Sequence, residues 1–164
     1  AKVVFIGPCA SKKLEAMRHS VRSAVDFVIT FEELWGLFDA KNITPSTCEE
    51  LPEETQAATA AGRGYAIAGG VAGAIENCLK EYYPDVPVHI EHAESLAECK
   101  KVLTLAKAGK IKNCMIEGMA CPGGCIGGAG TNAGFAKTSK ALKKYVDSSE
   151  PKLPSQELEN LELN

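Results

Sequence analysis

The 164 residues, 45% of them hydrophobic, suffice for one compact domain with a core of its own. Lysine and arginine together number 18 against 21 aspartates and glutamates, and the net charge of −3 excludes a broad basic surface for nucleic acid or an anionic membrane. No apolar run reaches the roughly 18 residues of a membrane span and no signal peptide is recognisable, so we expect a soluble, cytoplasmic protein.

The first part of the chain predicts two strands and a helix. Residues 2–6 and 26–30 are short runs of β-branched and aromatic side chains, which are typical of buried strands. Thr30 followed by Glu33 matches the capping box, in which two side chains satisfy free N–H groups at a helix start. We therefore expect a helix along FEELWGLFDA, directly after the second strand.

The middle of the chain is first irregular and then helical. Residues 41–64 contain two prolines and two glycines, which predicts a long surface excursion that includes a turn of helix. A helix is expected over residues 70–82 (GVAGAIENCLKEY), and the run VPVHI at 86–90 has the composition of a third strand.

The last third repeats the same pattern of elements. Ser95 with Glu98 forms a second capping box, which predicts a helix along LAECKKVLTLAKAG. Residues 113–116 (NCMI) predict a fourth strand, and apolar side chains at roughly helical spacing predict a helix over 132–147.

This alternation of strands and helices predicts an α/β fold. Parallel strands need crossover connections, usually helices, so we expect a parallel sheet of about four strands with flanking helices. We place this domain at residues 1–150 and expect the acidic tail, 151–164, to be loosely attached. Because Ala1 leads directly into an apolar run, we also expect that the chain is cut from a longer protein.

The cysteines carry the strongest chemical information. An odd number of them, without a secretory signal, indicates reduced thiols or metal ligands rather than a disulfide framework. Four have no partner at ligand spacing and are interpreted as structural: Cys48, Cys78, Cys99 and Cys114. The other three are Cys9, Cys121 and Cys125.

Two segments hold these three cysteines, and both follow a predicted strand. They are residues 5–16 (FIGPCASKKLEA) and residues 117–130 (EGMACPGGCIGGAG). In parallel α/β sheets ligands bind beyond the carboxyl ends of the strands, so Cys9 can meet Cys121 and Cys125 there.

The Cys-Pro-Gly-Gly-Cys loop favours a metal cluster over three other interpretations. Thiolates suit soft metals and iron-sulfur clusters, and the glycines allow backbone N–H groups to approach a bulky anionic group. The alternatives are a glycine-rich turn with incidental cysteines, a redox disulfide and a structural zinc site. The three-residue gap differs from the two-residue gap of thioredoxin-like motifs, and the histidines complete no zinc ligand set.

Both segments resemble cluster-binding motifs of the iron-iron hydrogenases. The family has a Pro-Cys-x-x-Lys-Lys-x-Glu stretch and an Ala-Cys-x-Gly-Gly-Cys stretch around its active-site cofactor. VDFVITFEELWGLF and GYAIAGGVAGAIE are similar as well, so the resemblance covers most of residues 2–147. It implies one lobe, the C-terminal part, of the catalytic domain, and the reversible conversion of protons and electrons to H2. The implied cofactor is the H-cluster, a 4Fe-4S cubane joined through a cysteine sulfur to a diiron centre.

The resemblance also implies roles for individual residues. By motif position, Cys9 and Cys121 are cubane ligands and Cys125 bridges the cubane and the diiron centre. Lys12 donates to a cyanide ligand of the diiron unit, and Met119 packs a thioether against it. Pro8 and Gly124 line the cofactor through the same motifs, and Glu15 is a partner for a motif lysine. Without the resemblance, Lys12 and Glu15 are surface residues and Met119 a core methionine.

The family's first cluster motif is absent from this sequence. That motif supplies the fourth cubane cysteine and a proton-relay cysteine, so we expect the upstream half of the protein to provide them and this chain alone to hold an incomplete cofactor. A ferredoxin-like electron carrier is the expected partner. Gly7, where well-known members have methionine, and the sequence GGAG at 127–130 indicate a divergent subgroup. A sensory or cluster-assembly module therefore stays an alternative, as does a plain α/β domain without metal.

Overall fold

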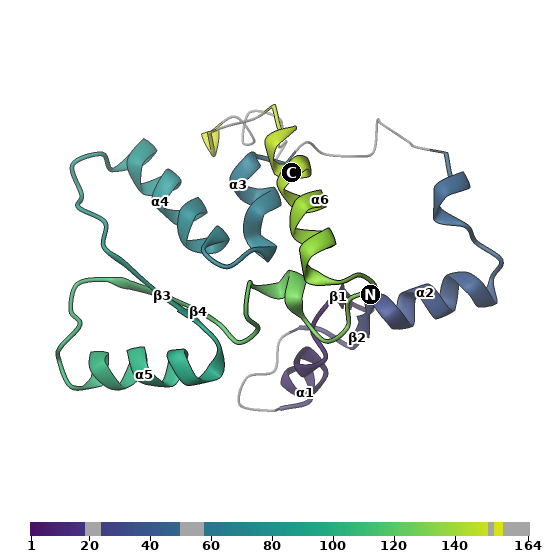
Figure 1. Ribbon diagram of the computed structural model, residues 1–164, viewed down its shortest axis with the longest axis horizontal. Coiled ribbons are helices and arrows are strands. Elements are labelled where there is room, and N and C mark those ends of the chain that lie inside the picture. Colours follow the sequence, from purple (N-terminus) through teal and green to yellow (C-terminus); the bar gives the residue numbers. More distant parts are fainter. Residues whose placement is uncertain (19–23, 50–57, 151–152, 156–164) are drawn as a thin grey trace.

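The protein is an α/β structure in which short parallel strands alternate with helices (Figure 1). The computed structural model describes residues 1–18, 24–49, 58–150 and 153–155. The elements follow in the order β1 (Val4–Gly7), α1 (Ser11–Met17), β2 (Phe27–Thr30), α2 (Phe31–Ala40), η1 (Pro45–Thr47), α3 (Ala60–Arg63), η3 (Gly64–Ala66), α4 (Gly70–Tyr82), β3 (Ile90–Glu94), α5 (Leu96–Lys107), β4 (Met115–Met119), η4 (Cys125–Gly127) and α6 (Phe135–Asp147).

The predicted fold class is confirmed, but the single sheet of about four strands is wrong. β1 pairs in parallel only with β2, and β3 pairs in parallel only with β4, among the residues described. The two sheets lie apart in Figure 1, and the segment containing η4 runs between them. Strand composition predicts that a run is extended, whereas its pairing partner depends on contacts distant in sequence. The number of strands per sheet was therefore not encoded locally.

Three strands form within two or three residues of the predicted places, and one does not. The prediction of a strand at residues 86–90 is wrong, because β3 spans Ile90–Glu94 instead. Pro87 has no N–H to give to a ladder. Pairing with β4 begins only at Ile90, which lies opposite Met115.

The four predicted helices are confirmed as α2, α4, α5 and α6, with bounds that shift by at most three residues. The capping box at Thr30 is complete, since Thr30 accepts from Glu33 N–H and the Glu33 carboxylate accepts from Thr30 N–H. At Ser95 it is altered. Ser95 accepts from Glu98 N–H, but the Glu98 carboxylate accepts from Glu94 N–H at 2.8 Å, because Ser95 N–H is donated to the Met119 carbonyl. The short helix α1 was not predicted, and α3 is a single helical turn inside the predicted excursion at 41–64.

The predicted excursion and tail are only partly described. Residues 41–49 hold the single turn η1, and α3 begins at Ala60, while residues 50–57 lie outside the described part. Of the tail, only 153–155 are described.

The buried core is small, and the first sheet is poorly covered. In the part of the chain that the structure describes, five hydrophobic residues are buried: Ala72, Ala74, Ala93, Val102 and Ile126. Along β1, the side chains of Val4, Phe5 and Ile6 stay 36% to 44% exposed. Among the described residues, none of the helices has the length and apolar character that crossing a membrane requires.

Candidate functional site

The first cysteine segment leaves the end of β1 and enters α1. Gly7 is the last residue of the strand and is buried, Pro8 and Cys9 are half-buried, and α1 begins at Ser11. A Cβ at Gly7 would lie 2.8 Å from the Phe5 ring, so the strand end has no room for a larger residue in this arrangement. Cys9 thus lies beyond the carboxyl end of a parallel strand, as predicted.

The second cysteine segment leaves the end of β4 in the same way. β4 ends at Met119, Cys121 lies two residues on, and Cys125 opens the turn η4. Between the cysteines, Gly123 and Gly124 have φ angles of +79° and +92°, a region that side-chain-bearing residues rarely adopt. These two glycines therefore make the tight reversal of the loop possible.

We expected the N–H groups of this loop to be available to a bulky anionic group, but they do not face open space. The structure pairs all five glycine N–H groups between 123 and 130 with protein oxygens. Gly123 donates to the Glu94 carboxylate at 2.9 Å, Gly124 to the Cys121 carbonyl at 3.0 Å, and Gly128 to the Cys125 carbonyl at 2.9 Å. The glycines serve close packing of the chain on itself.

The backbone brings the two cysteine segments together. The N–H of Gly130 donates to the carbonyl oxygen of Pro8 at 2.9 Å, although 122 positions separate the two residues. A Cβ at Gly128 would lie 2.4 Å from the same carbonyl oxygen and 2.9 Å from that of Cys125. Only glycine allows this approach, so Pro8, next to Cys9, lies directly against the segment that follows Cys125.

Electrostatics link the three predicted cysteines to one another. The Cys125 thiol is partly withdrawn from water, which raises its pKa. The charges of Cys9 and Cys121 raise this pKa further. The Lys12 ammonium acts in the opposite direction and lowers this pKa. Cys9, Cys121 and Lys12 thus all lie within electrostatic reach of the Cys125 sulfur.

Lys12 and Glu15 lie in a different cavity from Cys125. The Lys12 ammonium is 2.8 Å from one Glu15 carboxylate oxygen and 2.9 Å from the other, one turn along α1. Both line a cavity of about 190 Å³ beside Phe5 and Val28. The pairing of Glu15 with Lys12 agrees with the role that the resemblance implies for Glu15, but Lys12 is not on the cavity wall that holds Cys125.

A larger, mostly apolar cavity of about 380 Å³ has Pro8 and Cys125 in its wall. One face of α2 forms much of the remainder, through Phe31, Leu34, Trp35 and Phe38. The spacing of these four residues, i, i+3, i+4 and i+7, is readable in the sequence. Their place beside Cys125 cannot be predicted there, because it depends on contacts distant in sequence, such as the hydrogen bond from the Asn132 side chain to the Phe31 carbonyl at 3.1 Å.

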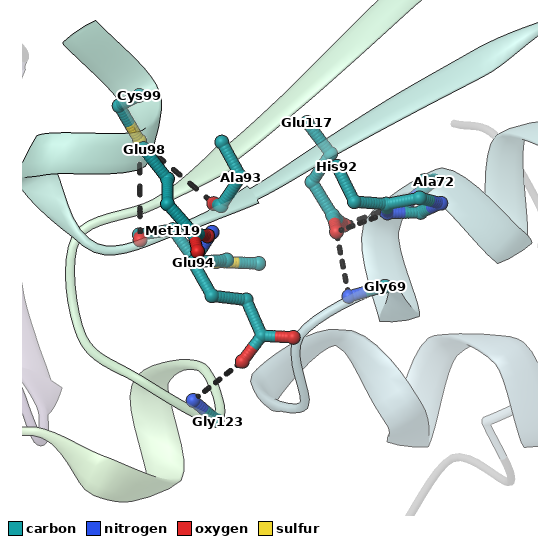
Figure 2. Close-up of polar contacts among 10 residues, drawn as sticks. All are labelled: Gly69, Ala72, His92, Ala93, Glu94, Glu98, Cys99, Glu117, Met119 and Gly123. Carbon is teal, nitrogen blue, oxygen red and sulfur yellow. Dashed lines mark hydrogen bonds and ion pairs between the residues drawn. The ribbon is translucent and has the colours of Figure 1, made fainter. Parts of the chain in front are cut away.

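Glu94 at the end of β3 holds the cysteine loop, and sequence reasoning missed it. Its carboxylate accepts the Gly123 N–H, as Figure 2 shows. Gly123 is held from two further sides, since its carbonyl accepts from Ala68 N–H at 3.1 Å and the Phe135 ring covers its Cα. Gly123, which lies between Cys121 and Cys125, is thus held by strand β3, by the segment before α4 and by helix α6.

Glu117 in β4 is a second missed residue. Glu117 is buried, with 6% of its surface exposed. Its carboxylate accepts hydrogen bonds from the Gly69 N–H at 2.5 Å and the Ala72 N–H at 3.0 Å, and it lies 3.3 Å from His92 Nδ1 (Figure 2). Burial raises its pKa, but the hydrogen bonds from Ala72, His92 and Gly69 outweigh burial, so the net pKa is lowered. Glu117 ties the start of α4 to the strand that leads into the cysteine loop.

The roles predicted for the other site residues stay predictions. Met119 is half-buried, and its carbonyl accepts from Ser95 N–H at 2.8 Å. Gly124 is buried, and a Cβ there would meet the backbone of residues 66–68. Cys78 and Cys99 lie in α4 and α5 as expected, Cys48 follows η1, and Cys114 precedes β4 rather than lying in it.

The cysteines are not spaced for a single ion. Within the described ranges, no three His, Cys, Asp or Glu side chains lie close enough to hold one metal ion. In a tetrahedral zinc site with bonds of about 2.3 Å, thiolates lie about 4 Å apart. An iron-sulfur cluster carries several irons and accepts thiolates at wider spacing. The chemistry of the three thiols, which come from two converging segments, fits the thiolate ligands that iron-sulfur clusters take.

Comparison with known proteins gives consistent results. The family model described as "Iron only hydrogenase large subunit, C-terminal domain" matches residues 1–129. The chain is 32% identical over 160 residues to the NADP-reducing hydrogenase subunit HndD of Solidesulfovibrio fructosivorans, covering 78% of this chain and 27% of that protein. It is 26% identical over 178 aligned positions to cytosolic iron-sulfur assembly component 3 of Bos taurus, covering 85% of this chain and 37% of that protein.

Solved structures share the fold. A variant of the FeFe-hydrogenase HydA1 from Chlamydomonas reinhardtii matches with a TM-score of 0.57 and 20% identity, over 99% of this chain and 59% of that one. The FeFe-hydrogenase HydA(deltaEFG) matches with a TM-score of 0.56 and 20% identity, over 95% and 56%. The chain thus spans more than half of these structures and about a quarter to a third of the curated relatives.

Proposed function

The chain belongs to the iron-only hydrogenase family, as the C-terminal domain of the large subunit, and on that premise we propose that it serves the reversible conversion of protons and electrons to H2. The observation that supports this best is the hydrogen bond between Gly130 N–H and the Pro8 carbonyl. It joins the two segments whose cysteines would share one cofactor.

In this proposal three cysteines hold the cofactor. Cys9 and Cys121 would hold the 4Fe-4S part of the cofactor, and Cys125 would serve both its 4Fe-4S and its diiron part. When bound, this group supplies electrons and the iron site at which they combine with protons. Bound thiols must lose their protons, so the raised pKa of Cys125 makes its binding favour higher pH.

The neighbouring residues position and shield the cofactor. An ammonium has three N–H donors, so Lys12 can keep Glu15 as a partner and still donate to an anionic ligand of the diiron unit. The apolar face of α2 lines the cavity beside Cys125 and would make the surroundings of a bound cofactor apolar on that side. Met119 adds a polarisable thioether near the same end of β4.

The complete site needs partners that the sequence predicts. Three cysteines are one short of a cubane's usual set, so we propose that the upstream half of the protein supplies the fourth together with a relay cysteine. A ferredoxin-like carrier delivers or removes electrons in this account.

The test is hydrogen evolution by the complete gene product, loaded anaerobically with iron, sulfide and a synthetic diiron complex. Reduced methyl viologen supplies electrons, and gas chromatography measures H2. Cys125→Ser is expected to abolish evolution, whereas Cys48→Ser, at an exposed position after η1, is expected to retain it. Full activity in the Cys125→Ser variant would refute the proposal.

A second function is favoured by one specific observation, the similarity to cytosolic iron-sulfur assembly component 3 over 85% of this chain. A protein of that kind would need the cysteines for an iron-sulfur cluster but no diiron unit. If the loaded wild-type protein binds a cubane, evolves no H2 and restores activity to an apo iron-sulfur enzyme, the assembly role replaces the hydrogenase role.

A further inference from the structure

We propose that Glu94 is a positioning residue that fixes the Cys121–Cys125 loop and lowers the reduction potential of the cluster bound there. The hydrogen bond from Gly123 N–H to Glu94 Oε2 carries the first half of this proposal. The second half rests on the proposed function, because it needs a cluster at these cysteines.

Glu94 is itself held in place by its surroundings. It is the last residue of β3 and lies opposite Met119, the last residue of β4. Its own N–H donates to the Glu98 carboxylate at 2.8 Å, and Ser95 beside it has φ +122°, a strained angle for serine. The Ser95 N–H bond to the Met119 carbonyl, 2.8 Å, holds that angle. The backbone at the end of β3 is therefore held by hydrogen bonds at both Glu94 and Ser95, and this orients the Glu94 side chain toward the loop.

The acceptor at Glu94 is charged, which strengthens the bond although the Glu94 side chain is exposed to solvent. A carboxylate that accepts from a backbone N–H forms a charge-assisted hydrogen bond, about twice as strong as a neutral one. Gly123 is the middle residue between the two cysteines, and as a glycine it has no side chain that could hold it in place. Removal of the carboxylate leaves the Ala68 bond and the Phe135 ring as its remaining anchors.

The same carboxylate acts on a bound cluster in two ways. It adds a negative charge beside the loop, which disfavours the more negative, reduced form of the cluster. It also keeps the Gly123 N–H away from the cysteine sulfurs, where N–H donors raise the potential. Both effects make the cluster harder to reduce.

Hydrogen exchange of the Gly123 amide tests the positioning in the full chain without any cluster. Glu94→Ala is expected to speed exchange about tenfold or more, whereas Glu94→Gln, whose neutral amide oxygen still accepts but more weakly, is expected to lie between Glu94→Ala and wild type. Glu91→Gln removes the same charge from the same strand and is expected to leave Gly123 unchanged. Unchanged exchange in Glu94→Ala would overturn the positioning role.

An EPR-monitored redox titration of the cluster-loaded complete gene product tests the second half. Glu94→Gln keeps the acceptor but loses the charge, and it is expected to favour the reduced cluster about tenfold, which is about 59 mV for one electron. Glu91→Gln is expected to shift the potential less. Equal potentials for Glu94→Gln and wild type would overturn the charge effect. A wild-type protein that binds no cluster would refute the proposed function, while the exchange experiment would still decide the role of Glu94.

Discussion

The Gly130 N–H donates a 2.9 Å hydrogen bond to the carbonyl oxygen of Pro8, which places the residue before Cys9 against the glycine segment that follows Cys125. Neither residue carries a reactive group. Their contact nevertheless brings the two cysteine segments side by side, and the predictions below concern that arrangement and the residues that support it.

Gly128→Ala should separate the two cysteine segments. Its Cβ would lie 2.4 Å from the Pro8 carbonyl oxygen, and both clashing partners are backbone atoms that cannot rotate away. We expect a loss of about 1–3 kcal/mol in the free energy of unfolding, measured by urea denaturation. Gly36→Ala is the control, because a Cβ there meets nothing within 4 Å in helix α2 and should stabilise by about 0.5–1 kcal/mol. Equal midpoints for the two variants would contradict the packing described.

Ser95 combines a helix cap with a strained backbone, and two substitutions separate these effects. Ser95→Gly relieves the φ of +122° and loses only a few tenths of a kcal/mol as a cap, so we expect equal or greater stability. Ser95→Ala keeps the strain and loses the bond to Glu98 N–H, so it should cost about 1 kcal/mol. Thermal unfolding of both variants measures the difference. A glycine variant less stable than the alanine variant would show that the strain is absent.

Glu117 should make stability depend on acidic pH. Its pKa is lowered in the folded protein, so its contribution is complete well above its ordinary value of 4.5 and is lost as the pH falls through the folded pKa, below 4.5. Glu117→Gln should cost about 1.5–3 kcal/mol near neutral pH, where charged hydrogen bonds are lost, and the cost should shrink toward pH 3. Urea midpoints between pH 3 and pH 7 measure it. A cost that does not change with pH would argue against an ionised Glu117.

Lys12 should accelerate the reaction of the Cys125 thiol in the cluster-free chain. Its ammonium lowers the Cys125 pKa against the effect of burial, so Lys12→Gln leaves less thiolate at a given pH. Alkylation by iodoacetamide at Cys125, followed by mass spectrometry, should slow about threefold at low salt and less at high salt. Lys13→Gln is the matched control, because Lys13 pairs with Glu33 at 2.6 Å. The same rate in both variants would remove Lys12 from the surroundings of Cys125.

The sequence predicted the four longer helices correctly because their signals are local. The Thr30 cap, the apolar spacing along α2 and the Cys-Pro-Gly-Gly-Cys loop can each be recognised within about ten residues. The pairing of strands into two sheets could not be recognised in this way, since it depends on contacts between distant segments.

Strand β3 was misplaced for a related reason. Its sequence IEHAE is polar and does not look like a strand, but two of its polar side chains are the ones that hold the site. His92 contacts Glu117, and Glu94 accepts from Gly123. Strand propensity reflects packing on a half-buried surface, so a strand whose polar residues make specific contacts is easily missed.

The most direct test of the central claim is iron and sulfide analysis after anaerobic reconstitution of this chain, with a small thiol in excess as the fourth ligand. The claim is that Cys9, Cys121 and Cys125 bind one common cluster. We predict about four irons and four sulfides per chain for the wild type and for Cys48→Ser, and a large loss in each of Cys9→Ser, Cys121→Ser and Cys125→Ser. Wild-type iron content in the Cys9→Ser variant would contradict the claim, because it would show that the two segments do not share a cluster.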